Sequence, residues 1–315
     1  MNCPPILFLI FNRPQLTRQV FAHIRDAGPA RLFIAADGPR PDHPDDDNLC
    51  NEARKIIDQV DWPCEMLTLF REKNLGCRRA VSTAIDWFFS HVSEGIILED
   101  DCIPDPSFFR YAEELLSRYR DDKRVMVVAA QHFHGNDHTP MHSYFFSRYN
   151  HIWGWASWRR AWQYYDRDMS QWPTLKDTDW LLAVGDGNRA FKRYWTEIFN
   201  AVHAGKIDTW DYQWTFSCWA QNGLSILPAR NLVTNVGFGK DASHTKGDGR
   251  AHANLLMELL EFPLSHPLTM VRDIAADEWT DRHVYGIRDE PEWKKTLRKI
   301  SGLNMVILLL RAIRR

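Results

Sequence analysis

Strand and helix patterns alternate through the first hundred residues of the chain. Residues 6–11 form a continuous apolar run, as in a strand buried on both faces, and residues 15–27 carry apolar side chains at helical spacing. Further patterns predict strands at residues 31–36, 65–70 and 95–98, and helices at residues 52–60 and directly after residues 74–76. Repeated β-α-β units of this length predict a parallel sheet covered by helices on both faces.

The pattern is harder to follow in the second half, where ten of the fourteen tryptophans lie between Trp153 and Trp219. Here we predict strands at 125–130 and 144–148 and helices at 189–204 and near 253–260, while the aspartate-rich segment 40–48 is predicted to be a solvated loop. We divide the chain into residues 1–125 and 126–250, the two halves of one domain, and a C-terminal extension at residues 251–315.

The composition excludes several classes of protein. The chain is 44% hydrophobic and 25% charged, which is ordinary for a globular protein, and its formal net charge is -2. Because nucleic-acid-binding proteins usually carry a basic excess, we expect no nucleic-acid partner. Six scattered cysteines without a C-x-x-C pair predict reduced thiols in a cytoplasmic protein. No apolar run approaches the roughly 20 residues that a membrane-spanning helix needs.

Polar residues follow three of the predicted strands at the point where each strand ends. Asn12 and Arg13 follow the first strand, Asp37 follows the second, and residues 99–101 follow the fourth. Ligands of open α/β sheets bind outside the carboxyl ends of the strands. These three strand ends are therefore expected to converge on one crevice.

Glu99, Asp100 and Asp101 are three consecutive carboxylates directly after a buried strand. Their mutual repulsion must be offset, and a divalent cation that bridges a diphosphate would offset it. Carboxylate oxygens are hard ligands that suit Mg²⁺ or Mn²⁺. The alternative is an acidic loop that caps the next helix, since residues 104–106 read Pro-Asp-Pro.

With these motifs in place, the chain resembles glycosyltransferases of the GT-A fold, near the inverting N-acetylglucosaminyltransferase I-like enzymes and their bacterial relatives. The motifs occur in family order over residues 4–245: Phe11-Asn12-Arg13-Pro14, Asp37-Gly38, Asn74-Leu75-Gly76 with Arg78-Arg79, Ile97-Leu98-Glu99-Asp100-Asp101, Trp153-Gly154-Trp155-Ala156-Ser157-Trp158, Trp210-Asp211-Tyr212-Gln213-Trp214 and Asn235-Val236-Gly237-Phe238-Gly239. Each motif is weak alone, and the ordered set is specific.

The resemblance implies an α/β fold with a GT-A, Rossmann-like, mostly parallel sheet flanked by helices, a tryptophan-rich acceptor side and a C-terminal helical tail. It also implies transfer of a sugar from a nucleotide diphosphate donor, expected to be a UDP-sugar, to a hydroxyl of a glycan or lipid-linked acceptor. A hexosyl or N-acetylhexosaminyl group would be transferred with inversion, although the sequence does not exclude a retaining enzyme.

The resemblance further implies a set of donor-binding residues: Phe11, Asn12, Arg13, Asp37, Asn74, Arg79, Glu99 and Asp100. Asp101 is then the expected ligand of Mn²⁺ or Mg²⁺, with His244 as a second metal ligand. The triplet reads Glu-Asp-Asp rather than Asp-x-Asp, which leaves open how many of its oxygens reach the metal. Arg79 could instead be a solvated helix charge, and His244 an ordinary surface histidine.

An inverting transfer needs a general base that takes the acceptor proton, and Asp211 is the candidate. The neighbouring rings of Trp210 and Trp214 could raise its pKa by desolvation. The competing interpretation makes Asp211 the N-cap of a helix at residues 212–220. Flat aromatic faces also suit sugar rings, so four tryptophans are the expected acceptor-binding residues, although most rings of this region are expected to belong to the core: Trp153, Trp155, Trp210 and Trp214.

The C-terminal tail carries basic residues on both sides of an apolar segment at residues 303–310. This pattern suits an interfacial anchor at the inner membrane face, and the alternative is a terminal helix docked on the protein. Two other functional classes stay open. A sugar nucleotidyltransferase would normally show a glycine-rich loop after the first strand, and a non-catalytic carbohydrate-binding protein would not need the carboxylate triplet.

Overall fold

The computed structural model describes residues 3–237 and 255–288, and it confirms the alternation of strands and helices in the first hundred residues. In chain order the elements are β1 (Ile6–Ile10), α1 (Pro14–Ala27), β2 (Arg31–Ala36), α2 (Asp46–Arg54), η1 (Lys55–Gln59), β3 (Glu65–Phe70), α3 (Cys77–His91), β4 (Glu94–Glu99), β5 (Cys102–Pro104), α4 (Pro106–Arg118), β6 (Val125–Ala129), η2 (Gly135–Asp137), β7 (Tyr144–Ser147), β8 (Trp155–Trp158), α5 (Arg159–Trp162), α6 (Trp172–Leu175), α7 (Trp180–Val184), α8 (Arg189–His203), α9 (Asp211–Ala220), β9 (Leu224–Pro228), β10 (Val233–Asn235) and α10 (Ile274–His283).

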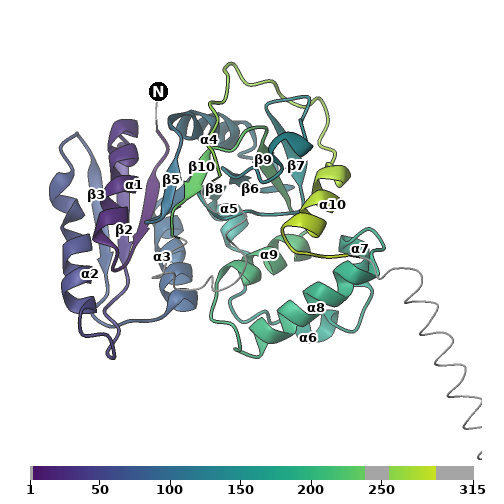
Figure 1. The fold of residues 1–315 in the computed structure, drawn as a ribbon, viewed down its shortest axis with the longest axis horizontal. Helices are drawn as coiled ribbons and strands as arrows, with labels where there is room; N and C mark the ends of the chain where they lie inside the picture. Colours follow the sequence, from purple (N-terminus) through teal and green to yellow (C-terminus); the bar gives the residue numbers. More distant parts are fainter. Residues whose placement is uncertain (1–2, 238–254, 289–315) are drawn as a thin grey trace, which may run out of the picture.

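One eight-stranded sheet runs through the molecule in the order β3-β2-β1-β4-β8-β6-β9-β7 (Figure 1). Strands β3, β2, β1 and β4 are mutually parallel, as are β6 and β9, whereas β8 is antiparallel to both of its neighbours and β7 is antiparallel to β9. The fold is therefore the expected α/β, Rossmann-like arrangement, with a mostly parallel sheet flanked by helices. The predicted boundary after residue 125 falls inside β6, within this continuous sheet.

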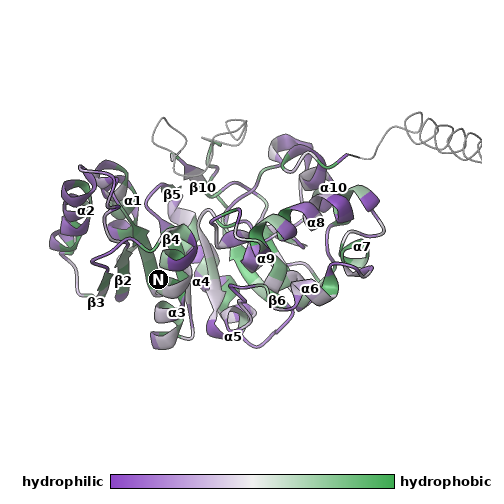
Figure 2. Cartoon of the chain, turned by 90° about the horizontal axis from the view of Figure 1, so that it is seen from below, coloured by the Kyte–Doolittle hydropathy of each residue, from purple (hydrophilic) through white to green (hydrophobic). Residues whose placement is uncertain are grey.

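Both faces of the sheet are covered, which explains the unbroken apolar run of β1. Leu7 and Leu9 pack into one hydrophobic cluster beneath α3, α8 and α9. Ile6, Phe8 and Ile10 point the other way, into a second cluster beneath α1, α2 and α4. Figure 2 shows the hydrophobic colour concentrated on the strands and on the helix faces turned toward them.

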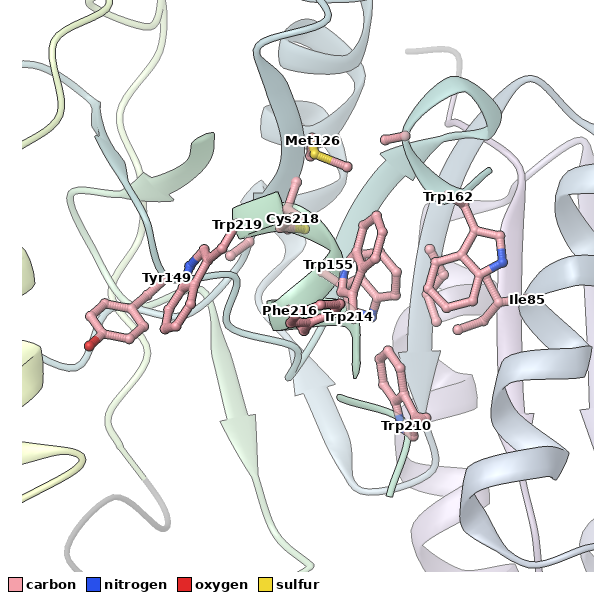
Figure 3. Packing of buried hydrophobic residues seen from close by; sticks show 14 of the residues in the cluster. Ile85, Met126, Tyr149, Trp155, Trp162, Trp210, Trp214, Phe216, Cys218 and Trp219 are labelled. Atoms are coloured by element: carbon pink, nitrogen blue, oxygen red, sulfur yellow. The ribbon is translucent and has the colours of Figure 1, made fainter. Parts of the chain in front are cut away.

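The tryptophan-rich region builds core, as expected for most of its rings. Trp155, Trp158 and Trp162 are spaced as on one face of a helix. In the structure, however, Trp155 and Trp158 belong to β8 and only Trp162 lies in a helix, α5. Strand β8 fills the place between β4 and β6, so sheet pairing overrides the local periodicity. The rings of Trp155, Trp162, Trp210 and Trp214 pack together against α3 and α9 (Figure 3).

Helix α2 begins at Asp46, inside the segment 40–48 that was predicted to be a loop. Asp46 accepts hydrogen bonds from Asn12 at 2.7 Å and from Arg40 at 2.7 Å, and these bonds anchor the first turn. A carboxylate is also favoured at a helix N-terminus. The single helix predicted at 52–60 is consequently the end of α2 followed by the 3₁₀ segment η1.

The helix predicted near residues 253–260 is wrong over its described part, residues 255–260, which has no regular secondary structure. The backbone N–H of Glu258 donates to the carbonyl of Asn231 at 2.9 Å, and the Asn231 side chain donates to the carbonyl of Leu256 at 3.3 Å. Contacts with a distant segment thus take the place of the hydrogen bonds that a helix would form within itself.

The expected C-terminal anchor at residues 303–310 and its membrane contact lie outside the described residues. Among the helices of the two described ranges, none combines the length and the apolar character needed to cross a membrane.

Helix α10 is tied to the sheet by buried charges. Arg148 follows β7, its side chain is 4% exposed, and its Nη2 donates to Asp281 of α10 at 2.6 Å. Tyr149 donates its hydroxyl proton to the same carboxylate. Asp277, one turn earlier, accepts from the hydroxyl of Ser147 and from the backbone N–H of Arg148. These bonds fix the position of the segment that returns to the sheet after residue 255.

A buried histidine beside α10 makes the stability of the fold depend on pH. Burial lowers the pKa of His134 to about 4 against an ordinary value of 6.5, and the nearby rings of His132 and His138 add to the effect. Between pH 6.5 and pH 4, His134 therefore binds a proton in the unfolded chain but not in the folded protein. We expect the free energy of unfolding to fall by up to about 3 kcal/mol as the pH drops from 6.5 to 4.

Urea unfolding of the wild type and of His134→Gln at about pH 7.5 and about pH 4.5 checks this expectation. Glutamine stays neutral, so the variant should lose less stability on acidification than the wild type. Parallel losses in the two proteins would contradict it.

Candidate functional site

A cavity of about 500 Å³ lies at the carboxyl ends of β1, β2 and β4, where the sequence predicted the strand ends to converge. The first turns of α3, the loop before β8 and the loop before α9 form its other walls. Ten of the predicted site residues line it: Phe11, Arg13, Asp37, Asn74, Glu99, Asp100, Asp101, Trp153, Trp210 and Asp211.

Asp37 holds together two motifs that are far apart in the sequence. Its carboxylate accepts the backbone N–H groups of Gly38, Leu75 and Gly76 at 2.9 to 3.2 Å. Asn74 in turn donates from its amide to the carbonyl of Gly38 at 2.8 Å. Burial raises the pKa of Asp37 above its ordinary value, and the three backbone N–H groups oppose that rise. The end of β2 and the start of α3 thus form one rigid wall.

Glycine is required at position 38 of this wall. A Cβ atom there would lie 2.3 Å from the carbonyl carbon of Lys73, a distance that side chains essentially never show. The motif Asp37-Gly38 therefore has a packing reason as well as a hydrogen-bonding one.

Arg13 lies against the acidic triplet. Its guanidinium forms a short ion pair with Asp100, and its Nη1 lies 2.9 Å from Asp101 Oδ2. Burial raises the pKa of Asp100, whereas the charge of Arg13 lowers it. Burial also raises the pKa of Glu99, and the neighbouring charges of Asp101 and Asp100 add to that rise. Negative charge thus exceeds positive charge at this wall, and Arg13 supplies part of the balance.

The small two-stranded sheet of β5 and β10 packs the triplet from the other side. The backbone N–H of Val236 donates to the carbonyl of Asp101 at 2.9 Å, and the Asn235 amide lies 3.5 Å from its carboxylate. A Cβ atom at position 237 would lie 2.1 Å from Asp101 Oδ2, so a larger residue there would require the Asp101 side chain to shift. The expected metal ligand His244 lies outside the described residues.

The donor set of the triplet fits a divalent cation in its chemistry, because carboxylate oxygens are hard ligands. The positions of the side chains are those of an ion pair with Arg13. In residues 3–237 and 255–288, no three His, Cys, Asp or Glu side chains are grouped so that they could hold a metal ion. Binding of a cation at Asp101 would require Arg13 to move or a further ligand to arrive.

Asp211 lines the cavity as the first residue of α9. The N-cap position belongs to Trp210, and no side chain caps the helix there, so the N-cap interpretation of Asp211 does not hold. Thr209 donates its hydroxyl proton to the Asp211 carboxylate in a short hydrogen bond. The carboxylate is thereby oriented within the cavity.

Of the four tryptophans expected to bind an acceptor, Trp153 and Trp210 line the cavity, but Trp210 is only 2% exposed and its ring packs on Trp155 and Trp162. Trp155 and Trp214 do not, because their side chains have no exposed surface and pack within the core (Figure 3). A buried ring offers no face to a sugar, so the expectation for these two residues is corrected.

Two expected donor residues also lie elsewhere. Asn12 is absent from the cavity lining, and its amide is engaged by Asp46 at the start of α2. Arg79 lines an adjoining groove rather than the cavity. Motif position alone did not separate these two residues from the neighbours that do line the cavity.

Sequence reasoning missed three charged residues that line the cavity, Arg40, Arg71 and Asp208. Arg71 directly follows β3, so the rule that ligands bind at strand ends could have found it. Arg40 stands in the segment predicted to be a solvated loop, where its guanidinium lies over the ring of Phe11, 5.4 Å from the ring centre. Asp208 precedes Asp211 by three residues and carries no motif of its own.

No protein-family model and no curated protein matches this chain. Among solved structures, it is similar to HddC from Yersinia pseudotuberculosis (12% identity over 39% of this chain and 56% of that one, TM-score 0.27) and to a UDP-glucose pyrophosphorylase complexed with UDP-glucose (12%, 40% and 56%, TM-score 0.25). It is also similar to mouse xyloside xylosyltransferase 1 (11% identity over 68% of this chain and 80% of that one, TM-score 0.31). The chain thus matches less than two thirds of the first two proteins. Likeness at this level leaves function to be argued from the cavity.

Proposed function

We propose that the protein is a glycosyltransferase that moves a hexosyl or N-acetylhexosaminyl group from a nucleotide diphosphate sugar, a UDP-sugar first of all, to a hydroxyl of a glycan or lipid-linked acceptor. The observation that carries the proposal is the content of one cavity. It combines three arginines with a carboxylate that a hydrogen bond orients: Arg13, Arg40, Arg71 and Asp211.

The three arginines and the ring of Phe11 are suited to binding the nucleotide diphosphate of the sugar donor. Guanidinium groups bind the oxygens of phosphates in a paired geometry, and an aromatic ring gives a stacking face for a nucleobase. The guanidinium of Arg40 already lies over the ring of Phe11, the residue that directly follows β1. These groups favour a nucleoside diphosphate over an uncharged sugar as the molecule that fills the cavity.

Asp211 suits the acceptor. In an inverting transfer the acceptor oxygen attacks the anomeric carbon of the donor sugar, and the proton of the acceptor hydroxyl passes to the carboxylate. The bond between the anomeric carbon and the diphosphate oxygen breaks, and its electron pair stays on the departing diphosphate. Membership of the N-acetylglucosaminyltransferase I-like group is part of this proposal, and so is inversion.

A divalent cation, Mn²⁺ or Mg²⁺, is also part of the proposal, with Asp101 as the residue that would hold it. Such a cation would stabilise the negative charge of the departing diphosphate. Arg13, paired with Asp100 and Asp101, already supplies one positive charge at this wall. The need for the cation is therefore a separate question from the identity of the donor.

Nucleotide binding is tested by thermal unfolding with UDP, with GDP, and with UTP together with a sugar 1-phosphate, each with and without Mn²⁺. We expect UDP to stabilise the folded protein by about 2.7 kcal/mol at a hundredfold excess over its dissociation constant. Asp101→Asn should remove the part of the stabilisation that depends on Mn²⁺ and leave the rest, with the exposed Asp26→Asn on α1 as the matched control.

The results separate the proposals. Stabilisation by UDP that is independent of Mn²⁺ in the wild type would leave the donor site standing and exclude the cation. Stabilisation by UTP together with a sugar 1-phosphate, but not by UDP, would favour a nucleotidyltransferase. No effect of any nucleotide would sink the transferase proposal and leave a carbohydrate-binding protein.

A further inference from the structure

A second hollow, of about 390 Å³, adjoins the cavity. Six residues line this arginine groove: Leu75, Arg78, Arg79, Arg167, Asp168 and Asp208. Asp208 lines both hollows, so the groove and the cavity meet at the loop that leads to Asp211. A Cβ atom at position 76 would lie 2.9 Å from Asp208 Oδ2, which shows how closely this loop packs against the start of α3.

Positive charge exceeds negative charge in the groove, with three guanidinium groups against two carboxylates. Asp168 lies 3.5 Å from Arg78 Nη2 and 3.7 Å from Arg167 Nε, and its side chain is 74% exposed. Such long, solvated ion pairs are weak, so a ligand can compete with them. In the part of the chain that the structure describes, Arg79 has no carboxylate within ion-pairing distance.

Arg78 is held in place by the backbone of the loop that carries Arg167. Its Nη2 donates to the carbonyl of Arg167 at 2.5 Å, while its Nε is buried and has no acceptor in the described protein. Because its Nε has no exposed surface, a ligand in the groove would contact Arg78 only through the exposed 20% of the side chain. The backbone at the start of α3 also favours an anion in the groove. No side chain caps the helix there, and a helix N-terminus attracts negative charge.

We propose that the arginine groove binds an anionic group of the acceptor, a phosphate or a carboxylate, while the acceptor hydroxyl lies at Asp211. This inference rests on the proposed transferase function and adds the acceptor class to it. The donor diphosphate already has Arg13, Arg40 and Arg71 in the cavity. A further set of arginines on the far side of Asp208 therefore serves a second anionic group, which the donor does not supply.

The test titrates inorganic phosphate and glucuronate into the protein saturated with UDP, by calorimetry at constant ionic strength. The variants are Arg79→Gln and Arg167→Gln, whose side chains are accessible, so that the core is left intact. Arg18→Gln, a half-exposed arginine of α1 outside both hollows, is the matched control. We expect each groove variant to weaken binding of the anion by roughly tenfold or more, since one charge-assisted pair is lost, with UDP affinity unchanged.

Loss of phosphate binding supports an acceptor with a phosphate, and loss of glucuronate binding supports one with a carboxylate. If neither anion binds the wild type, or if the groove variants bind as it does, the proposal is overturned. Weaker UDP binding in the groove variants would assign the arginines to the donor site, which overturns the acceptor role and leaves the transferase standing. A wild type that binds no UDP contradicts the proposed function itself, and the acceptor role with it.

Discussion

Asp211→Asn is expected to lower the rate of sugar transfer by about 10²- to 10⁴-fold, the usual contribution of a general base. Asparagine keeps the shape of the side chain and can still accept the hydrogen bond from Thr209. It cannot take the proton of the acceptor hydroxyl. The loss should therefore fall on turnover, with the affinity for UDP close to that of the wild type, because the arginines of the cavity are untouched.

The measurement is the transfer rate at saturating donor, with UDP affinity determined in parallel and Asp26→Asn as the control. A variant that keeps more than about a tenth of the wild-type rate would remove Asp211 from the role of base. Equal losses of turnover and UDP affinity would instead indicate that Asp211 helps to shape the donor site.

The part of the site that strand ends define could be predicted from the sequence. Asp37 and Asp101 follow buried apolar runs, and the carboxyl ends of parallel strands meet at one edge of a sheet. The strands themselves were visible because burial on both faces leaves an uninterrupted run, as in β1. For such residues the position at the end of a strand is enough to predict that they lie in the crevice, because the parallel strands of the sheet all end there.

Other parts depend on contacts between distant segments, which no local pattern records. Trp155 has helical spacing to its neighbours, yet it lies in β8 because a strand is needed between β4 and β6. The pairing of Arg13 with Asp100 joins residues 87 positions apart. Arg79 belongs to the groove rather than the cavity, because the loops that carry Arg167 and Asp208 close over the start of α3. Only the tertiary structure decides which hollow a side chain enters.

The buried ion pair between Arg148 and Asp281 is the other place where one substitution should have a large effect. Both side chains are 4% exposed, and the Asp281 carboxylate is also held by the hydroxyl of Tyr149. Arg148 makes further bonds to the carbonyl of Val184 at 3.0 Å and to Asp186 at 3.1 Å. Its guanidinium thus joins β7, α7 and α10.

Arg148→Met is expected to lower the free energy of unfolding by about 3–5 kcal/mol, because it leaves a buried carboxylate without its counter-ion. Arg148→Met combined with Asp281→Leu should recover part of that loss, since an apolar pair of similar volume is often as stable as a buried ion pair, while the hydroxyl of Tyr149 loses its acceptor. Arg282→Met, which breaks an exposed pair with Glu278 on the same helix, is the control and should cost less than about 1 kcal/mol.

Urea unfolding at neutral pH measures all three differences. A single variant within about 1 kcal/mol of the wild type would show that water or a shifted proton neutralises Asp281 without cost, as at an exposed pair. A double variant as unstable as the single one would instead place the loss in the contacts of Arg148 with Val184 and Asp186 and in the unpaired hydroxyl of Tyr149. Recovery in the double variant is the result that assigns the energy to the unpaired charge, and it would show that the ion pair itself adds little net stability over an apolar pair at this contact between α10 and the sheet.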